Sequence, residues 1–386
     1  MARKIVVGID VGTSLVRVVV AECFPGVEIP RIIGTGVAES RGLRHGYIIQ
    51  PEEATKSIEK AIKEAEKNSH ITIKRAFLSL GGISLDSTLS SGNAVISRGD
   101  SEVSEGDITK ATDESRKNLG GLNNKKIIQT IPVGFKIDGK DVHGRAVGMK
   151  GLKLEVKTLF ITCLKQHMED MVSAVEDAGV QVIEVVASPL AASYVAVSKR
   201  QKTVGCAIVN IGAETVSLIV FENDVPISLH VFQIGSTDIT SDIALGLRVS
   251  LEEAEVIKRG DKREQYPRKR LEEIIEARLT DIFELIDNHL KKIGRSGLLP
   301  AGIFITGGGS GIATVEDLAR ASLALPVKVL GKEVVDMSSG KPRMLDSTWF
   351  VSYGLCVLGK DDHEKEVGLW GDISSGAKDF IKSLLP

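Results

Sequence analysis

The stretch Gly8-Ile9-Asp10-Val11-Gly12-Thr13-Ser14 decides the fold of this chain. The apolar run 5–7 precedes it and the mostly apolar run 16–20 follows it, and two such runs around a glycine turn are typical of a β-hairpin. The tip carries a carboxylate, two hydroxyls and glycine backbone, which are groups that hold a phosphate and its Mg²⁺. Taken alone, the same tip also fits an ordinary polar turn.

A second hairpin of this kind is expected about one domain length later. The apolar run 204–209 is followed by Asn210-Ile211-Gly212-Ala213-Glu214-Thr215 and by the apolar run 216–221. A further run, 303–306, ends in the glycine-rich segment 307–311, where a flat ligand can lie against bare backbone. This order and spacing resemble the actin-like ATPase superfamily. The resemblance implies an α/β fold with two duplicated domains that flank a nucleotide cleft.

Length and composition limit the remaining possibilities. A chain of 386 residues with 42% hydrophobic residues suits a soluble protein of two or more domains. The net charge of −2 and the lack of a dense Lys/Arg stripe give no reason to expect nucleic acid as a partner. The four cysteines form no CxxC pair, so buried thiols are favoured over a metal site. The sequence contains no uninterrupted apolar stretch of about 20 residues, so a membrane-spanning helix is not expected.

The expected domain organisation follows the duplication. Hydrophobic periodicity predicts a helix at about 51–68 and a long helix at about 270–292, and Ser250-Leu251-Glu252-Glu253 predicts a capping box at the start of another. The expected segments are the first domain (1–82, 163–200 and a return at 346–359), an inserted α+β subdomain (83–162), the second domain (201–345, with a helical subdomain at about 226–299), a linker (360–368) and an amphipathic helix (369–386).

Motifs outside the hairpins narrow the resemblance. Ser40-Arg41-Gly42-Leu43-Arg44-His45-Gly46-Tyr47-Ile48 precedes the first long helix, and the insert contains Ile131-Pro132-Val133-Gly134-Phe135 and Val147-Gly148-Met149-Lys150-Gly151. The stretch 237–244 follows the second hairpin. Together these resemble FtsA, the bacterial actin homologue of cell division, from the first hairpin to the C-terminus. That family carries an insert of this type in place of one actin subdomain.

The resemblance implies ATP and Mg²⁺ as cofactors and assigns roles to individual residues. Asp10 would hold Mg²⁺ through water, and the late glycine segment would border the adenosine. Glu255 and Lys258 lie three positions apart, so both can face the cleft from one helix, although a solvated salt bridge is the alternative. The predicted nucleotide-binding residues are Asp10, Gly12, Thr13, Ser14, Asn210, Gly212, Ala213, Thr215, Glu255, Lys258, Gly307, Gly308 and Gly309.

Two departures from the superfamily predict slow ATP hydrolysis. Many members begin the second hairpin with Asp, where this chain has Asn210. Others place a water-orienting Glu before a proline, where this chain has Ser188 followed by Pro189. Orienting the attacking water is a main protein contribution to phosphoryl transfer. ATP is therefore expected to be a structural ligand with weak or absent turnover, and no catalytic residue is assigned.

The C-terminal segment predicts an amphipathic membrane helix. At about 100° per residue its aromatic and aliphatic side chains fall on one side and its charged side chains on the other. Docking of the same helix on the protein's own core is the alternative. A terminal membrane helix also occurs in FtsA, which favours the first interpretation. The predicted membrane residues are Trp370, Ile373, Phe380, Ile381, Leu384 and Leu385.

The resemblance also implies partners and a location. It predicts a peripheral protein at the cytoplasmic face of the membrane at the division site, which binds the acidic FtsZ C-terminal peptide, polymerises and contacts other divisome proteins. A basic patch on the subdomain of the long helix suits an acidic peptide, whereas an ordinary solvated helix face is the alternative. The predicted FtsZ-binding residues are Arg268, Lys269, Arg270 and Arg278.

Two rival functions are compatible with the same hairpins. One is PilM, an FtsA-like scaffold of type IV pilus assembly, which lacks the terminal membrane helix. The other is a small-molecule kinase of the superfamily, against which Asn210 and the FtsA-type insert argue.

Overall fold

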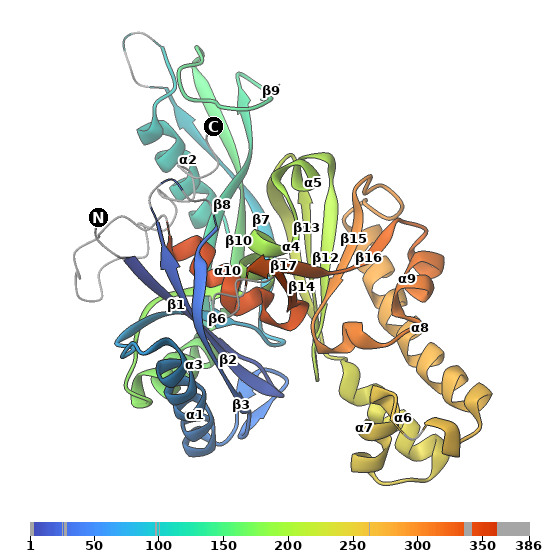
Figure 1. Cartoon of the computed structure of the whole chain (residues 1–386). Coiled ribbons are helices and arrows are strands. Elements are labelled where there is room, and N and C mark those ends of the chain that lie inside the picture. The colour runs from blue at the N-terminus through green and yellow to red at the C-terminus, as the bar shows by residue number, and fades with distance from the viewer. Residues whose placement is uncertain are drawn as a thin grey trace.

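The protein consists of two α/β lobes and an insert (Figure 1). The computed structural model describes residues 4–360, apart from 25, 27–28, 97–98, 100, 262 and 336–341. The predicted membrane helix 369–386 and residues 361–368 of the predicted linker lie outside the described residues. None of the helices in the described part combines the length and the apolarity needed to cross a membrane.

The first lobe is built on a five-stranded sheet of order β11-β6-β1-β2-β3. Glycines let helices approach both of its faces closely, because a Cβ at Gly8 would collide with Ser352 and a Cβ at Gly36 would collide with Ala61. The helix α10 covers one face and α1 the other. The elements are β1 (Lys4–Val11), β2 (Leu15–Cys23), β3 (Arg31–Glu39), β4 (Leu43–Arg44), β5 (Tyr47–Ile48), α1 (Pro51–Ser69), β6 (Arg75–Leu80), α3 (Lys165–Asp177), β11 (Gln181–Ala187), α4 (Ser188–Ala196), α5 (Lys199–Val204) and α10 (Phe350–Gly359).

The second lobe repeats this plan with strand order β16-β15-β12-β13-β14. In both lobes the first two strands form an antiparallel hairpin, and the first strand also pairs in parallel with a later one. Figure 1 shows α4 and α10 between the two sheets. The predicted duplication is therefore visible strand by strand. The elements are β12 (Cys206–Ile211), β13 (Val216–Glu222), β14 (Val225–Phe232), α6 (Ser236–Leu247), α7 (Leu251–Arg259), α8 (Arg268–Lys292), β15 (Gly302–Thr306), α9 (Val315–Leu323) and β16 (Val327–Val329).

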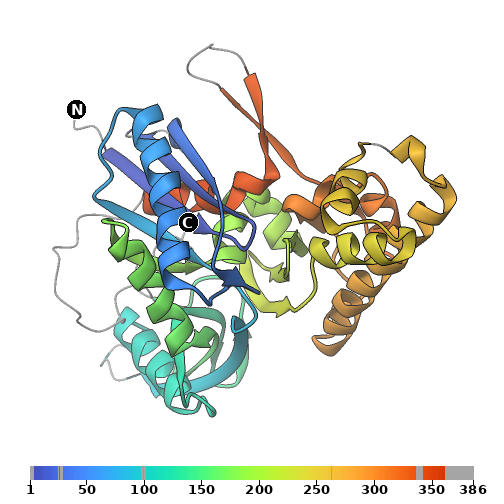
Figure 2. The same ribbon diagram turned by 90° about the horizontal axis from the view of Figure 1, so that it is seen from below.

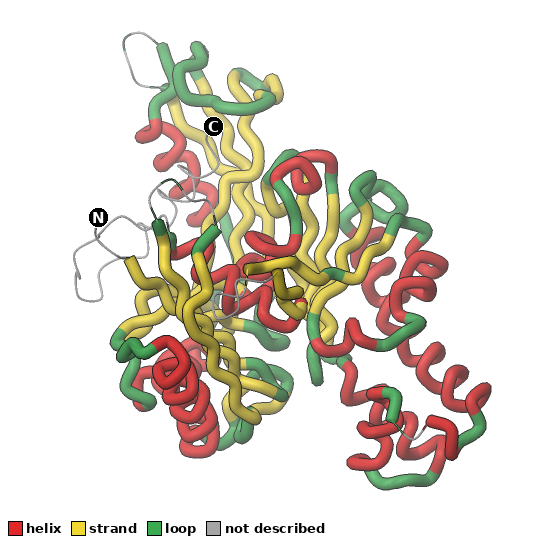
Figure 3. Tube along the Cα trace, in the orientation of Figure 1, coloured by secondary structure: helices red, strands yellow, loops and turns green. Residues whose placement is uncertain are grey.

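Helices α6, α7 and α8 form the helical part of the second lobe (Figure 3). α8 buries an apolar stripe whose members recur every three or four residues, from Leu271 to Leu290. The predicted capping box at Ser250 is only half formed. The Ser250 hydroxyl accepts from the backbone N–H of Glu253, but the Glu253 carboxylate accepts from the Tyr266 hydroxyl at 2.7 Å instead of returning to the cap.

The insert is an α+β unit whose strands extend the sheet of the second lobe. A single residue pair, His230 with Asp86, joins β14 to the insert strand β7, and the combined sheet has nine strands. A β17–β18 hairpin extends away from the lobes in Figure 2. The elements of the insert are β7 (Asp86–Val95), α2 (Glu105–Lys117), β8 (Lys125–Ile137), β9 (Lys140–Val142) and β10 (Lys153–Leu164). The hairpin outside the insert consists of β17 (Gly331–Val335) and β18 (Pro342–Asp346). Short 3-10 turns elsewhere in the chain are Arg263–Gln265, Gly308–Gly311 and Ser347–Trp349.

Two histidines pack at this seam between the insert and the second lobe. His230 Nδ1 lies 3.1 Å from Asp86 Oδ1, and the His289 ring of α8 stacks on the His230 ring with centroids 4.9 Å apart. His289 Nε2 also lies 2.8 Å from the Ser228 hydroxyl. Burial, together with the nearby charges of His230 and Lys292, lowers the pKa of His289 to about 4.

This depressed pKa predicts a pH-dependent stability at the seam. His289 stays neutral in the folded chain but takes a proton near pH 6.5 when unfolded, so its contribution is present above pH 6.5 and is lost as the pH falls toward 4. The free energy of unfolding of the parent should fall when the pH is lowered from 7 to 4.5. We expect this fall to be smaller in His289→Gln, by on the order of 1 kcal/mol. Urea unfolding at both pH values measures this, with the exposed His143→Gln as control. An equal loss in all three proteins would contradict the prediction.

Candidate functional site

The tips of the β1–β2 and β12–β13 hairpins share one backbone design. The N–H of Gly12 donates to the carbonyl of Leu15 at 3.2 Å, and the N–H of Gly212 donates to the carbonyl of Thr215 at 2.9 Å. A Cβ at either glycine would lie 3.0 Å or less from the carbonyl oxygen to which the N–H of that glycine donates. Glycine is thus required at the same point of both turns, and the duplication extends to the tips.

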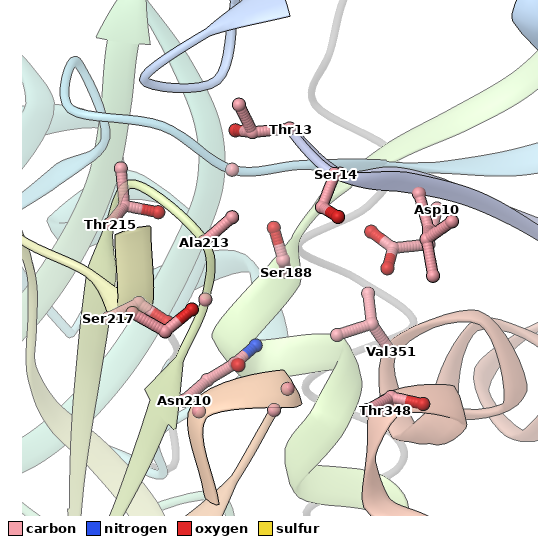
Figure 4. A pocket seen from close by; sticks show the side chains of 18 of the residues that line it. Asp10, Thr13, Ser14, Ser188, Asn210, Ala213, Thr215, Ser217, Thr348 and Val351 are labelled. Carbon is pink, nitrogen blue, oxygen red and sulfur yellow. The ribbon is translucent and has the colours of Figure 1, made fainter. Parts of the chain in front are cut away.

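The two tips face a common cavity between the lobes of about 560 Å³. In Figure 4, Thr13 and Ser14 lie on one side, Ala213 and Thr215 on another, and Ser188 lies between them. All thirteen residues predicted from the sequence to bind the nucleotide line this cavity. Lining residues that the prediction did not name include Arg17, Gly46, Gly81, Gly82, Ser217, Asp346 and Thr348.

Asp10 places a carboxylate at the wall of the cavity. Burial raises its pKa, while a 2.6 Å hydrogen bond from the Ser79 hydroxyl and the charge of Arg17 partly oppose this effect. A divalent cation in front of a buried carboxylate would stabilise its charged form. The donor set of one carboxylate and neighbouring hydroxyls suits a hard cation such as Mg²⁺ that keeps most of its water ligands. The residues present therefore fit the expected metal.

Arg17 is the cation that sequence reasoning missed. It pairs with Asp10 in the β1–β2 register, and its guanidinium lies 5.7 Å from the centroid of the Trp349 ring. Burial lowers its pKa, and the charges of Asp10 and Asp346 counteract that effect. The signal was available, because a single arginine interrupts the valine run of β2. A half-buried positive charge beside the first tip suits an anionic ligand.

The glycine segment after β15 exposes backbone to the cavity at Gly308 and at Gly311. Gly307 has φ of +90°, and a Cβ there would collide with the Asn210 side chain and the Ile211 carbonyl. A Cβ at Gly309 would collide with Ile211 as well. At Gly308, by contrast, a Cβ would meet nothing within 4 Å. Gly307 and Gly309 thus shape the turn, and Gly308 presents bare backbone.

Glu255 and Lys258 both line the cavity and also bind each other. Lys258 Nζ lies 2.7 Å from Glu255 Oε2, and it donates to the Thr240 hydroxyl at 2.7 Å. Burial disfavours the Glu255 carboxylate, but hydrogen bonds from Lys258 and Thr240 outweigh it and hold its pKa below the usual value. The sequence offered a position at the cleft and a salt bridge as alternatives for Glu255 and Lys258. The structure shows both features at once in this pair.

The positions that matter for hydrolysis carry no carboxylate. Asn210 occupies the place in β12 that Asp10 occupies in β1, since it pairs with Ser217 as Asp10 pairs with Arg17. Ser188 begins α4 and lines the cavity. Among the described lining residues the carboxylates are Asp10, Glu255 and Asp346.

The basic residues predicted to bind a peptide lie on α8 and already have polar partners. Arg278 binds Asp242 at 2.6 Å, and Arg270 donates to the carbonyl of Gly246 at 3.1 Å. Arg268 and Lys269 pair with acidic residues one turn further along α8, and their side chains are 89% and 91% exposed. The first turn of α8 contains no acidic residue.

Comparisons with known proteins place the chain in a family. The family model described as "Cell division protein FtsA" matches residues 207–345, and "SHS2 domain inserted in FTSA" matches residues 82–162. The cell division protein FtsA of Borreliella burgdorferi is 31% identical over 367 residues, which cover 87% of this chain and 88% of that protein. This chain belongs to the FtsA family. FtsA of Bacillus subtilis is 29% identical over 85% of this chain and 78% of its own length.

Solved structures confirm the actin-like fold. The structure titled "PilM-PilN type IV pilus biogenesis complex" has a TM-score of 0.67 at 15% identity and covers 92% of this chain and 99% of its own. MreB5 of Spiroplasma citri bound to ADP has a TM-score of 0.53 at 13% identity, over 92% of this chain and 96% of that one. At such identities the likeness shows the fold alone, and the curated FtsA relatives decide the family.

The glycine geometry predicts that substitution by alanine destabilises the fold at Gly307 but not at the neighbouring Gly308. We expect Gly307→Ala to lower the free energy of unfolding by about 2 kcal/mol or more, because its φ and its contacts exclude a Cβ. Gly308→Ala should leave it unchanged within about 0.5 kcal/mol. Urea unfolding of the two variants beside the parent decides this. Equal destabilisation by both would show that the turn is described wrongly.

Proposed function

We propose that this protein is an ATP-binding, actin-like cell division protein that tethers the FtsZ ring to the cytoplasmic face of the membrane. The observation that supports it most is the cavity, because two equivalent glycine turns and a bare-backbone glycine segment meet there in a chain of the FtsA family. Membrane-bound filaments and contacts to further divisome proteins belong to the same proposal.

ATP with Mg²⁺ fits the distribution of groups in the cavity. The two tips offer backbone N–H groups and hydroxyls to phosphates from opposite sides. Asp10 would hold Mg²⁺ through its water ligands, and Arg17 adds positive charge beside the first tip. Gly308 and the Glu255–Lys258 pair are then left for the adenosine. Mg²⁺, when bound, neutralises phosphate charge, whereas the residues of the chain bind and orient the ligand.

Slow turnover is part of the proposal. Neither Ser188 nor Asn210 supplies a carboxylate to orient an attacking water, and Asp10 and Glu255 are engaged by Ser79 and Lys258. ATP would then act as a ligand that closes the cavity and permits polymerisation.

Binding of Mg·ATP should depend on the first tip and on the bare glycine. We expect Asp10→Ala and Gly308→Asp each to weaken Mg·ATP binding at least about 100-fold, because the first removes the carboxylate at the metal and the second fills ligand space with a negative charge. Isothermal titration calorimetry measures the affinity, and circular dichroism verifies the fold.

Matched controls carry the same changes far from the cavity. Gly106→Asp adds a carboxylate in the first turn of α2 in the insert, and Asp317→Ala removes one from the exposed start of α9. Both should bind Mg·ATP like the parent. Unchanged affinity in Asp10→Ala and Gly308→Asp would exclude the cavity as the nucleotide site.

The membrane part of the proposal rests on the sequence of the C-terminal segment. Its large apolar side chains are each worth roughly 1.5–3 kcal/mol when fully buried, so the gross gain is on the order of 10 kcal/mol before the cost of ordering the helix. Because the charged side chains of residues 369–386 cancel, apolar insertion would supply most of the binding. Reversible binding of one copy becomes firm when many copies assemble side by side.

The FtsZ part rests on the start of α8. Arg268, Lys269 and Arg270 occupy the first turn, where unpaired backbone N–H groups already create a positive end. Cations there do not stabilise the helix, and the exposed heads of Arg268 and Lys269 can exchange the acid that each binds in α8 for one on a disordered acidic peptide. This favours a docking role over a purely structural one.

Liposome co-sedimentation with FtsZ tests both parts together. Deleting residues 368–386 should release the protein and FtsZ from liposomes while the two still bind each other in solution. Replacing Arg268 and Lys269 by Glu should have the opposite pattern: the protein stays on the liposomes and recruits several-fold less FtsZ.

Three results would contradict these expectations. If the truncated protein still sediments with lipid, or if high salt strips the full-length protein from liposomes, the apolar anchor is wrong. If the double glutamate variant recruits FtsZ as the parent does, α8 is not the docking site.

A further inference from the structure

The turn between β4 and β5 extends from the first lobe to the tip of the β12–β13 hairpin. The backbone N–H of His45 in this turn donates to the carboxylate of Glu214, and His45 Nδ1 lies 3.2 Å from the carbonyl oxygen of Glu214. Because that carbonyl only accepts, Nδ1 carries the proton. Two hydrogen bonds, one of them to an ionised acceptor, therefore connect the lobes beside the cavity.

The other side of the same turn contacts a buried histidine of α3. His167 Nε2 lies 2.9 Å from the Gly46 carbonyl, and His167 Nδ1 lies 2.6 Å from the Ser84 hydroxyl. The Tyr47 ring packs on His167 with centroids 4.4 Å apart. Burial lowers the pKa of His167 and keeps it neutral. Nε2 then donates to Gly46, and Nδ1 accepts from Ser84.

These contacts leave little room for independent movement. Gly46 and Gly82 have φ of +85° and +93°, and a Cβ on either would collide with the backbone of the other or approach it closely. The N–H of Ile83 also donates to the carbonyl of His45 at 3.3 Å. The turn is thus packed backbone to backbone against residues 82–84, which lead directly into the first strand of the insert.

We propose that the His45–Gly46 turn positions the β12–β13 hairpin and relays its state to the base of the insert. The relay runs from Glu214 to His45 and Gly46, and from there through His167 to Ser84. It rests on the proposed binding of a nucleotide. Ala213 and Thr215 line the cavity on either side of Glu214, whose own carboxylate binds the turn, so a phosphate at this tip would set the position of Glu214.

The seam supports this direction of coupling. The insert joins the second lobe at β14, which directly follows the β12–β13 hairpin in the chain. The turn and the seam therefore attach the insert to the same three-stranded unit. A shift of that unit when the cavity closes would act on the insert at two places.

Hydrogen–deuterium exchange of the full chain, with and without Mg·ATP, tests the relay. In the parent we expect Mg·ATP to slow exchange about tenfold in residues 43–48 and in residues 82–87. In Glu214→Ala both effects should disappear while the ATP affinity stays within about threefold, since this side chain is not at the ligand. In Ser84→Ala the slowing should persist in residues 43–48 and fall to about half in residues 82–87, where the direct contacts of the turn with Gly82 and Ile83 remain.

Glu222→Ala is the matched control, because it removes a carboxylate from the other end of β13, where the partner is Arg295. It should behave as the parent does. Slowing in residues 82–87 that persists in Glu214→Ala, or that is undiminished in Ser84→Ala, would overturn the relay. If Glu214→Ala folds poorly, Glu214→Gln, which keeps a neutral acceptor, should retain the slowing only partly, and full retention would count against the proposal.

The ligand-free samples separate this inference from nucleotide binding. If calorimetry shows that the parent binds no ATP, the proposed function fails, but the relay still predicts that Glu214→Ala speeds exchange several-fold in both segments. Ser84→Ala should then speed it only in residues 82–87. If neither variant changes exchange without ligand, the relay is wrong whatever the nucleotide does.

Discussion

The closed glycine turn at each hairpin tip is the constraint on which the rest of the molecule depends. In each tip one N–H is tied to a carbonyl three residues away, which leaves the remaining tip backbone and hydroxyls facing the cavity. Such a turn keeps its position only if both of its strands are fixed. The sheets do this, because β1 and β12 each lie between an antiparallel and a parallel neighbour in the interior of their sheets.

The charges around the cavity have partners within the chain. Asp10 faces Arg17 in the strand register, and Glu255 binds Lys258. Burial alone would make each of these ions costly, and a partner with hydrogen bonds offsets much of that cost. A ligand that brings phosphates and a cation would supply opposite charges to both kinds of group. Within the chain itself, these pairs lower the cost of keeping charges at the cavity.

Local features of the sequence predicted the fold well. The actin-like class and the FtsA family are confirmed, and the long helices begin and end within a few residues of their predicted bounds, because apolar periodicity and glycine turns are local signals. The nine-stranded sheet was not predicted, since Asp86 and His230 are 144 residues apart and nothing in either segment marks the pairing. The capping box at Ser250 is only half formed because Tyr266, which lies beyond the end of α7, takes the Glu253 carboxylate.

The weakness of the seam explains why side chains matter so much for the insert. One bridging residue pair joins the insert to the second lobe, and it is reinforced by Ser87, whose hydroxyl bonds the backbone of Leu229 at 2.8 Å. Hydrogen bonds of this kind contribute about 1 kcal/mol each, which is small beside the apolar core that spans the seam. The orientation of the insert is set by this shared core, which contains Ile131 and Leu159 of the insert and Val231 of β14, together with the polar contacts at the seam and at the turn.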